Sequence, residues 1–320
     1  MAEIEGKRYL ISIDGGGTNT GVCIYDRFRN ISRSRVIGGG NYKTHGIEMV
    51  RKRIHTCLRN MLPEVEDIPA STHFLVMGLS GCDSQQDLDI YADMMRGIGF
   101  RQEQMMICND SEMIFRSVTD APGICTVAGT GTIALAFGID GKVRRSGGWG
   151  APISDEGSGY WIGAQITRKY LSWVDGLGEY NEFFPRFREV LECGSDEEAA
   201  ALLAAMSPAE IADWARPVFE AAPENSMCME VIRSGAEKTA ALTASVWHKA
   251  GFTADDHLFI VESGSLFKNE LYENCFRDAL LALLPDADYQ FLRSEGLPAE
   301  DGIRLAMKMA DDLVTTQSED

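Results

Sequence analysis

The 320-residue sequence lacks several patterns that mark particular classes of protein. No Cys-x-x-Cys pair occurs among its eight cysteines, and no cysteine–histidine spacing suits a zinc site. No apolar run reaches the length of a membrane span, and the first ten residues, MAEIEGKRYL, lack the apolar stretch of a signal peptide. We therefore expect a cytoplasmic protein with reduced thiols, in which Cys23, Cys108 and Cys125 behave as small core residues.

Positive charge is also scarce. There are 30 lysines and arginines against 48 aspartates and glutamates, which gives a net charge of −18. Such a balance argues against a nucleic-acid or membrane surface as partner. It does not argue against a bound nucleotide, because backbone dipoles, magnesium and a few cations can supply positive potential locally. The length allows two domains with separate cores, and no low-complexity linker divides the chain.

The pattern of strands and helices runs through the chain twice. In each half we expect two neighbouring strands joined by a glycine turn, followed by helices and further strands of a mixed α/β sheet. The expected strands are 9–13, 21–25, 31–37, 73–79, 105–108, 123–128, 133–137, 257–261 and 287–291, and the expected helices include 46–61, 87–98, 157–174 and 298–313.

The first glycine turn follows an aspartate. In LISIDGGGTNTG, Asp14 precedes Gly15, Gly16 and Gly17, and hydroxyl and amide side chains come next at Thr18 and Asn19. Glycine N–H groups at the end of a strand can cradle phosphate oxygens, whereas a carboxylate would repel them. A magnesium ion between Asp14 and the phosphates resolves that conflict. A plain β-hairpin turn is the alternative for this stretch taken alone.

A second glycine turn occupies the equivalent place in the second half. A hairpin turn is again a fair reading of this stretch by itself. Paired with the first turn across a cleft, it would hold the β- and γ-phosphates of ATP, with Thr18 and Thr130 adding hydroxyl donors. The turn consists of Gly129, Thr130, Gly131 and Thr132.

Asn109 and Asp110 follow the strand expected at 105–108. Both residue types are favoured as helix N-caps. The carboxyl end of a sheet strand is also where open α/β folds bind ligands, so a general base is expected there as well. Adjacent residues can serve both purposes.

The stretch from Gly147 to Gly163 combines many glycines, two tryptophans and an acidic pair. A capped helix behind a glycine loop explains Trp161 as a core residue. It does not explain why Asp155 and Glu156 lie among so many small residues. A sugar site typically combines carboxylates, which accept hydrogen bonds from the sugar hydroxyls, with an aromatic surface such as that of Trp149.

Together these stretches resemble the BadF/BadG/BcrA/BcrD ATPase family, and within it the N-acetylglucosamine kinases, which belong to the larger actin, hexokinase and Hsp70 superfamily. The resemblance runs from Asp14 to about Gly163 and is weaker at 261–267. It implies an α/β, two-domain ribonuclease H-like (actin-like ATPase) fold with an interdomain nucleotide and sugar cleft. The implied domains are residues 1–119, on which a C-terminal helix at about 302–316 packs, and residues 120–301.

The resemblance also implies roles for individual residues. Asp14 would lie near magnesium, bound through water, and Asp110 would be the catalytic base. The nucleotide would contact the two glycine turns (Asp14 to Asn19 and Gly129 to Thr132) and a third turn formed by Ser263, Gly264 and Ser265. The sugar would contact Asn41, Ser80, Gly81, Asn109, Gly148, Trp149, Asp155 and Glu156.

Three stretches depart from the family pattern. Pro152, Ile153 and Ser154 replace the usual Leu-Gly before the acidic pair, and Glu262 and Ser263 precede Gly264 where the nucleotide turn usually begins with two glycines. Residues 301–304, Asp-Gly-Ile-Arg, replace a small Gly-Ala pair. These changes bear on the identity of the sugar, the contacts with the base and the hinge.

The predicted function is an ATP- and Mg²⁺-dependent kinase that phosphorylates a hydroxyl of an amino sugar, N-acetylglucosamine before glucosamine. Position six and a homodimer are implied by the resemblance alone. The alternatives are an ATPase that activates a partner enzyme, as some family members do with an iron–sulfur cluster, and a non-catalytic sugar- or nucleotide-binding protein. Cys125 lies close to the second glycine turn, yet no second cysteine follows it with the spacing of a cluster site. A pure binder has no need of a base at Asp110.

Overall fold

The computed structural model describes residues 7–82, 84–294 and 298–317. The chain divides into two compact units, one made of residues 1–120 and 293–320, called unit 1, and the other of residues 121–292, called unit 2. Among the described residues, no helix is both long enough and apolar enough to span a bilayer. Each of the eight cysteines is a free thiol, and Cys23, Cys108 and Cys125 are buried as expected.

Unit 1 is built on a five-stranded mixed sheet with the order β3-β2-β1-β4-β5. The strands β1, β2 and β3 form an antiparallel meander, whereas β4 pairs parallel with β1 and β5 parallel with β4. The edge strand β3 is exposed along most of its length. The strands are β1 (Tyr9–Gly15), β2 (Asn19–Asp26), β3 (Ile31–Gly38), β4 (Thr72–Leu79) and β5 (Met105–Asn109).

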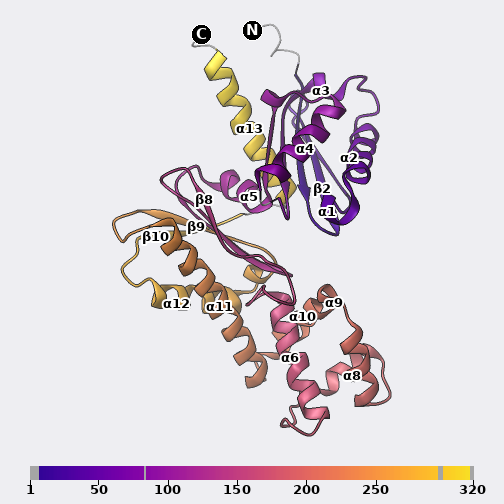
Figure 1. Ribbon diagram of the computed structural model, residues 1–320, viewed down its shortest axis with the longest axis vertical. Helices are drawn as coiled ribbons and strands as arrows, with labels where there is room; N and C mark the ends of the chain where they lie inside the picture. The colour runs from indigo at the N-terminus through magenta and orange to yellow at the C-terminus, as the bar shows by residue number, and fades with distance from the viewer. Residues whose placement is uncertain (1–6, 83, 295–297, 318–320) are drawn as a thin grey trace. The chain divides into compact units, whose positions relative to one another are not determined.

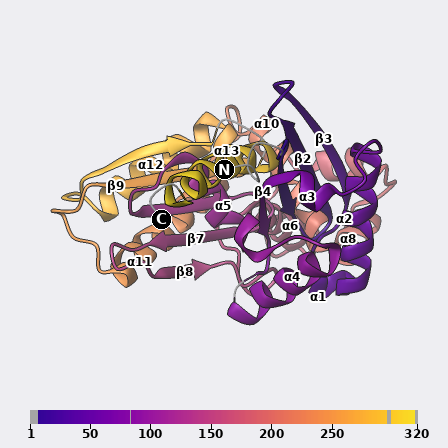
Figure 2. The same ribbon diagram turned by 90° about the horizontal axis from the view of Figure 1, so that it is seen from above.

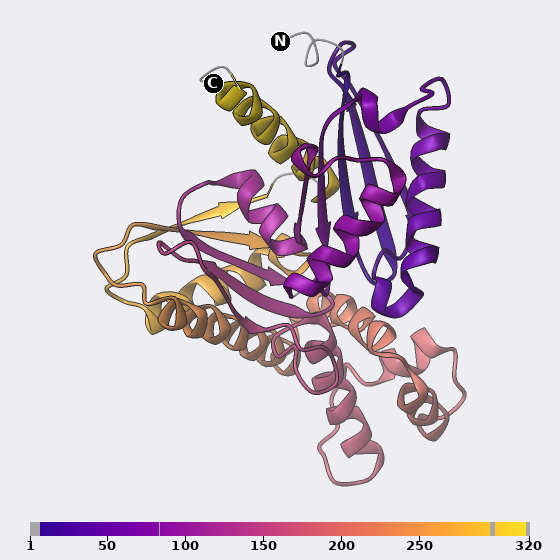
Figure 3. The same cartoon turned by 45° about the horizontal axis from the view of Figure 1, so that its top comes forward.

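Helices cover both faces of this sheet (Figure 3). Apolar side chains of α2 and α4 pack on one face, and those of α5 and α13 pack on the other. Because both faces are covered, β4 is buried at every position. The helices are α1 (Tyr42–His45), α2 (Ile47–Met61), α3 (Ile68–Ser71), α4 (Gln85–Ile98), α5 (Asp110–Val118) and α13 (Pro298–Gln317), the last drawn in yellow in Figure 1.

Unit 2 repeats the strand order of unit 1. Its sheet runs β10-β9-β6-β7-β8, in which β6, β7 and β8 are antiparallel and β9 lies parallel to β6. If the strands of each unit are numbered in chain order, both sheets run third, second, first, fourth, fifth from one edge to the other. The strands are β6 (Gly123–Ala128), β7 (Thr132–Phe137), β8 (Val143–Gly147), β9 (Leu258–Ser263) and β10 (Tyr289–Arg293).

The long helix α11 lies alongside β7 and β8 of this sheet (Figure 2). It also packs against α12. Small residues of α11, including Ala236, Ala240 and Ala244, are buried in the same cluster as Ala134 and Ala136 of β7, which lets the helix approach the sheet closely. The helices are α6 (Gly159–Val174), α7 (Pro185–Leu191), α8 (Asp196–Ala205), α9 (Pro208–Asp213), α10 (Ala215–Ala221), α11 (Ser226–Ala250) and α12 (Glu270–Leu283).

The expected α/β class with one mixed sheet in each half is confirmed. The strand β8 and the helices α1, α3 and α12 were not expected. In β8 the sequence VRRSG has one apolar residue and two arginines, so it carries no alternating apolar pattern. It forms because it completes the edge of the sheet beside β7.

Candidate active site

The carboxyl ends of three parallel strands in unit 1 bring several predicted residues together. Asp14 is the penultimate residue of β1, and Ser80 and Gly81 follow β4. Asn109 is the last residue of β5, and Asp110 follows it. The register is continuous across the strands, since Asp14 pairs with Gly78 and Gly78 pairs with Cys108. The sheet therefore places Asp14 and Asp110 at the carboxyl ends of β1 and β5, which flank β4.

Asp14 is flanked by glycine on both neighbouring strands, Gly21 of β2 and Gly78 of β4. Helices fill the space beside those glycines: a Cβ atom at Gly21 would lie 3.2 Å from Ala299, and one at Gly78 would lie 2.8 Å from Met113. This packing shields part of the carboxylate from water, and Asp14 is half-buried. Burial, followed by the negative charge of Asp110, raises the pKa of Asp14 to about 7.

The first glycine turn is held by hydrogen bonds to its carbonyl groups. The Gly40 N–H donates to Gly16 O at 2.9 Å, and the Ser80 N–H donates to Gly15 O at 2.9 Å. His45 Nε2 lies 2.9 Å from Gly17 O. These hydrogen bonds hold the turn on the protein through its carbonyl groups. Residues Gly17 to Asn19 are exposed at the surface, where a phosphate loop must lie.

Asn109 and Asp110 occupy the start of α5, as the capping pattern predicted. Asn109 is the N-cap, and its side-chain oxygen accepts from the Ser111 N–H at 2.9 Å. Asp110 is the first residue of the helix, and its Oδ1 accepts from the same N–H at 2.7 Å and from Ser111 Oγ at 3.3 Å. Ser111 thus fixes one oxygen of the candidate base.

Asn41 lies against the turn after β4. It is the N-cap of α1, where its Oδ1 accepts from the Lys43 N–H at 2.9 Å, and its Nδ2 donates to Ser80 O at 3.3 Å. Gly81 has a φ of +73°, and a Cβ there would lie 2.8 Å from Asn41 Nδ2. The structure therefore brings Asn41, Ser80 and Gly81 together.

A buried polar network behind Asn41 was missed by the sequence analysis. Tyr91 OH donates to Gly40 O at 2.8 Å and accepts from the Tyr42 N–H at 3.0 Å. Asp87 accepts from Tyr42 OH at 2.8 Å and pairs with Lys43 at 2.9 Å. The network ties the segment after β3 to α4. Its only signal in the sequence is the Ser84–Asp87 capping box at the start of α4.

In unit 2 the second glycine turn is docked on the start of α6. The Gly159 and Tyr160 N–H groups donate to the carbonyls of Gly129 and Thr130 at 2.8 and 3.2 Å. Thr132 Oγ1 donates to Glu156 O at 2.9 Å. The first N–H groups of a helix lack intrahelical partners, so these bonds satisfy α6 and fix the turn at once.

Asp155 is buried beneath this turn rather than displayed on the surface. Its φ is +64°, and its carboxylate accepts from the N–H groups of Thr132, Gly150 and Ala151. A Cβ at Gly131 would lie 2.8 Å from Asp155 Oδ2. Burial raises the pKa of Asp155 in spite of those hydrogen bonds, and the carboxylate joins the 150–155 loop to the second glycine turn.

The other candidate sugar residues of this loop have different surroundings. Glu156 is exposed and pairs with Lys238 of α11 at 2.8 Å. Trp149 is 72% exposed, and the Arg145 guanidinium lies 4.0 Å from the centre of its ring. Arg145 Nη2 also donates to Gly148 O at 2.7 Å. Trp161 packs against the core, as expected.

A cavity of about 340 Å³ opens beside the second glycine turn within unit 2. Of the predicted nucleotide residues, Gly129, Thr130 and Ser265 line it. Gly264 presses the third turn onto β6, since its φ is +100° and a Cβ there would lie 2.3 Å from Ala128 O. The lining residues that the sequence analysis missed are Gly159, Ala212, Asp213, Ala215, Arg216, Phe219, Leu266, Lys268 and Asn269.

Asp14 and Asp110 are the donors in unit 1 that suit magnesium. Within the described ranges, no group of three or more histidine, cysteine or acidic side chains forms a metal cage. Magnesium does not need one, because it usually keeps several waters and binds one or two carboxylates together with substrate phosphates. The half-buried carboxylate of Asp14 fits that mode of binding.

The chain resembles known proteins in both sequence and fold. The sequence model of the BadF/BadG/BcrA/BcrD ATPase family matches residues 11–283. An N-acetylmuramic acid/N-acetylglucosamine kinase of Clostridium acetobutylicum is 30% identical over 173 residues, which is 54% of this chain and 56% of that protein. An N-acetyl-D-glucosamine kinase of Dictyostelium discoideum is 27% identical over 201 residues, 60% of this chain and 63% of that protein.

The matched regions thus span less than two thirds of either relative. A crystal structure from Chromobacterium violaceum, described as an N-acetylglucosamine kinase, superimposes with a TM-score of 0.71. The superposition covers 94% of this chain and 99% of the other at 24% identity, which shows that the two chains share a fold.

Proposed function

The chain belongs to the BadF/BadG/BcrA/BcrD ATPase family, and from this premise we propose that it is an ATP-dependent sugar kinase. Its substrate is an amino sugar, N-acetylglucosamine or glucosamine, and the hydroxyl at position six receives the γ-phosphate. The two relatives named as N-acetylglucosamine kinases support this substrate class. The position of the hydroxyl comes from the family resemblance.

The observation that carries the proposal is the pair of carboxylates, Asp14 and Asp110, at the carboxyl ends of β1 and β5, where the charge of Asp110 acts on Asp14. Asp110 sits at the start of α5 with one oxygen held by Ser111, so its orientation is set before substrate arrives. It accepts the proton of the sugar hydroxyl as that oxygen attacks the γ-phosphate. Asn41, Ser80 and Gly81 lie at the adjoining strand end and orient the sugar.

Asp14 is the residue that would hold magnesium. Bound there with the phosphates, the ion would neutralise charge on the transferring group. The raised pKa of Asp14 supports this assignment, because a buried carboxylate beside a second one gains most from a nearby cation.

The nucleotide binds unit 2 at the 340 Å³ cavity. Phe219 offers an aromatic wall for the base, and Arg216 and Lys268 offer positive charge in a chain of net charge −18. Gly129 and Thr130 line the cavity, so phosphates bound there contact the second glycine turn. That both glycine turns act on the same phosphates stays a prediction.

Cys125 bears on the alternative of a partner-activating ATPase with an iron–sulfur cluster. Its side chain is fully buried in β6, where it cannot serve as a ligand at a surface. The kinase is therefore favoured.

A homodimer, a cytoplasmic location and the absence of nucleic-acid or membrane partners belong to the same proposal.

The test is ADP release from Mg-ATP across a panel of hexoses and amino sugars, with sugar phosphate measured in parallel. Asp110→Asn should lower kcat by about 10²- to 10⁴-fold, the usual contribution of a general base, while the sugar still binds. Asp93→Asn is the matched control, because Asp93 is an exposed aspartate paired with Arg96 on α4. ADP release that ignores every sugar, or full activity in Asp110→Asn, would refute the kinase.

A further inference from the structure

The buried glutamate Glu262 stands directly before the third turn, at one of the positions where the sequence departs from the family pattern. It lies on β9 in register with Thr126 of β6, and its side chain has no exposed surface. A buried carboxylate is costly unless it is paired and hydrogen-bonded. The carboxylate of Glu262 therefore needs a positively charged side chain beside it.

Arg277 of α12 supplies that partner with two parallel hydrogen bonds. Nε donates to Glu262 Oε1 at 2.9 Å and Nη2 donates to Oε2 at 2.6 Å. Such a fork fixes the angle between the two side chains as well as their distance. Arg277 also pairs with Glu273 at 2.6 Å, and its guanidinium lies 4.6 Å from the ring centre of Phe291 on β10.

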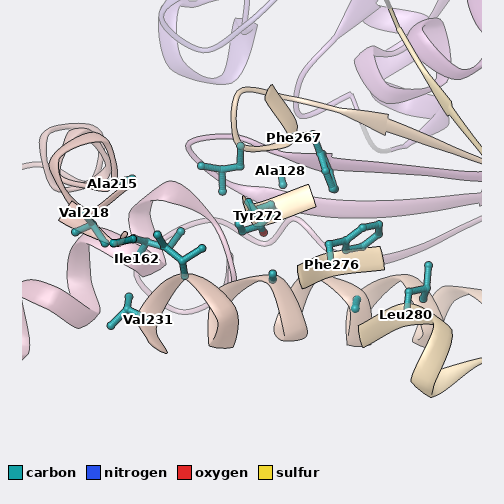
Figure 4. Close-up of a cluster of buried hydrophobic side chains, with 14 of the residues drawn as sticks. Ala128, Ile162, Ala215, Val218, Val231, Phe267, Tyr272, Phe276 and Leu280 are labelled. Atoms are coloured by element: carbon teal, nitrogen blue, oxygen red, sulfur yellow. The ribbon is translucent and has the colours of Figure 1, made fainter. Parts of the chain in front are cut away.

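The segment 263–269, called here the 263–269 turn, connects β9 to α12 and is closed by this ion pair at its base. Gly264 presses it against Ala128 of β6. Phe267 is buried and packs its ring 5.7 Å from Tyr272 and 4.9 Å from Phe276, centre to centre (Figure 4). The ion pair, the backbone contact of Gly264 and the packing of the Phe267 ring thus hold the 263–269 turn in place.

The same segment forms one wall of the cavity, through Ser265, Leu266, Lys268 and Asn269. Helices α9 and α10 also line the cavity, with Ala212, Arg216 and Phe219. The width of the cavity depends on where the end of β9 stands relative to α12. The Glu262–Arg277 pair joins those two elements directly.

We propose that Glu262 and Arg277 are positioning residues that set the nucleotide-binding wall of unit 2. This inference rests on the proposed function, because it takes the cavity to be the nucleotide site. Neither residue needs to touch the nucleotide. Their ion pair keeps Ser265 and Lys268 at the distance from Gly129 and Thr130 that a bound nucleoside phosphate requires.

The test uses Glu262→Gln and Arg277→Lys in the full chain. Glutamine removes the negative charge with little change of shape, and lysine keeps the positive charge but cannot form the fork. The control is Asp26→Asn, which disrupts a pair of the same geometry in unit 1, where Arg8 Nε and Nη2 donate to Asp26 at 2.8 and 2.6 Å.

Binding of a non-hydrolysable ATP analogue with magnesium is measured by calorimetry. We expect each variant of the Glu262–Arg277 pair to raise the Kd about tenfold, the double variant to cost no more than either single one, and the Kd for the sugar to stay unchanged. Asp26→Asn should leave both constants unchanged. Wild-type nucleotide affinity in Glu262→Gln and Arg277→Lys would overturn the inference.

Hydrogen–deuterium exchange without ligand gives a second readout. Amides of the 263–269 turn should exchange several-fold faster in both variants, while those of β1 and β4 keep their rates. Unchanged exchange in the turn would overturn the positioning role by itself. If the wild-type chain bound no nucleotide at all, the proposed function would fail, and exchange would still decide whether the pair holds the turn.

Discussion

Replacing Asp14 by asparagine should stabilise ligand-free unit 1, and the gain should be larger at pH 8 than at pH 5. The pKa of Asp14 rises from 3.8 to about 7, first because of burial and second because of Asp110. Between those two values the native state holds a proton that the unfolded chain has released. The free energy of unfolding therefore falls as the pH rises through this window.

The magnitude follows from the size of the shift. A shift of one pKa unit corresponds to about 1.4 kcal/mol, so holding Asp14 ionised in the native state costs at most about 4 kcal/mol at pH 8. At pH 5 the native carboxyl is already protonated, and the same relation leaves a cost of about 2 kcal/mol. Asparagine removes both costs, because it carries no charge in either state.

The tryptophans allow the two units to be followed separately. All five tryptophans of the chain lie between residues 149 and 247, within unit 2. Their fluorescence in a urea titration reports unit 2, while hydrogen–deuterium exchange of β1 and β4 amides reports unit 1. Both are recorded at pH 5 and pH 8 with EDTA present, so that no divalent cation neutralises the carboxylate.

The expected result is slower exchange in β1 and β4 of Asp14→Asn, by a larger factor at pH 8, with no change in tryptophan fluorescence. Asp110→Asn is a partial control, since it removes only the smaller cause of the shift. Equal protection of wild type and Asp14→Asn at pH 8, or a gain that is larger at pH 5, would show that Asp14 is ionised in the native state without cost. The reasoning about its burial would then be wrong.

Two further predictions concern unit 2. Gly264→Ala should lower the free energy of unfolding by at least about 2 kcal/mol, because its Cβ would meet Ala128 O at 2.3 Å. Gly251→Ala, also at positive φ but in open space, should cost only about 1 kcal/mol, and equal losses in the two urea titrations would argue against the clash. Trp149→Ala should change the free energy of unfolding by no more than about 0.5 kcal/mol, because Trp149 is 72% exposed. The same variant should raise the KM for the sugar about tenfold in the ADP-release assay. An unchanged KM would show that Trp149 does not belong to the sugar site.

Several parts of the fold could be predicted from sequence because local chemistry decides them. Short apolar runs marked β1 and β2, and the capping residues Asn109 and Asp110 marked the start of α5. The two glycine turns stood at equivalent places in the two halves. Strand β8 could not be predicted, because pairing with β7 and not its own pattern makes it a strand.

The sequence by itself determined which residues could carry charge, turn sharply or cap a helix, and so it singled out Asp14, Asp110 and the glycine turns. Only the tertiary structure decided their surroundings. Glu156 pairs with Lys238, 82 residues away, and Asp155 turns inward to backbone N–H groups. The cavity owes one wall to α9 and α10, in a region without a motif. Pairing, burial and pKa depend on neighbours that are distant in the chain, and those neighbours exist only after the sheets and helices have packed.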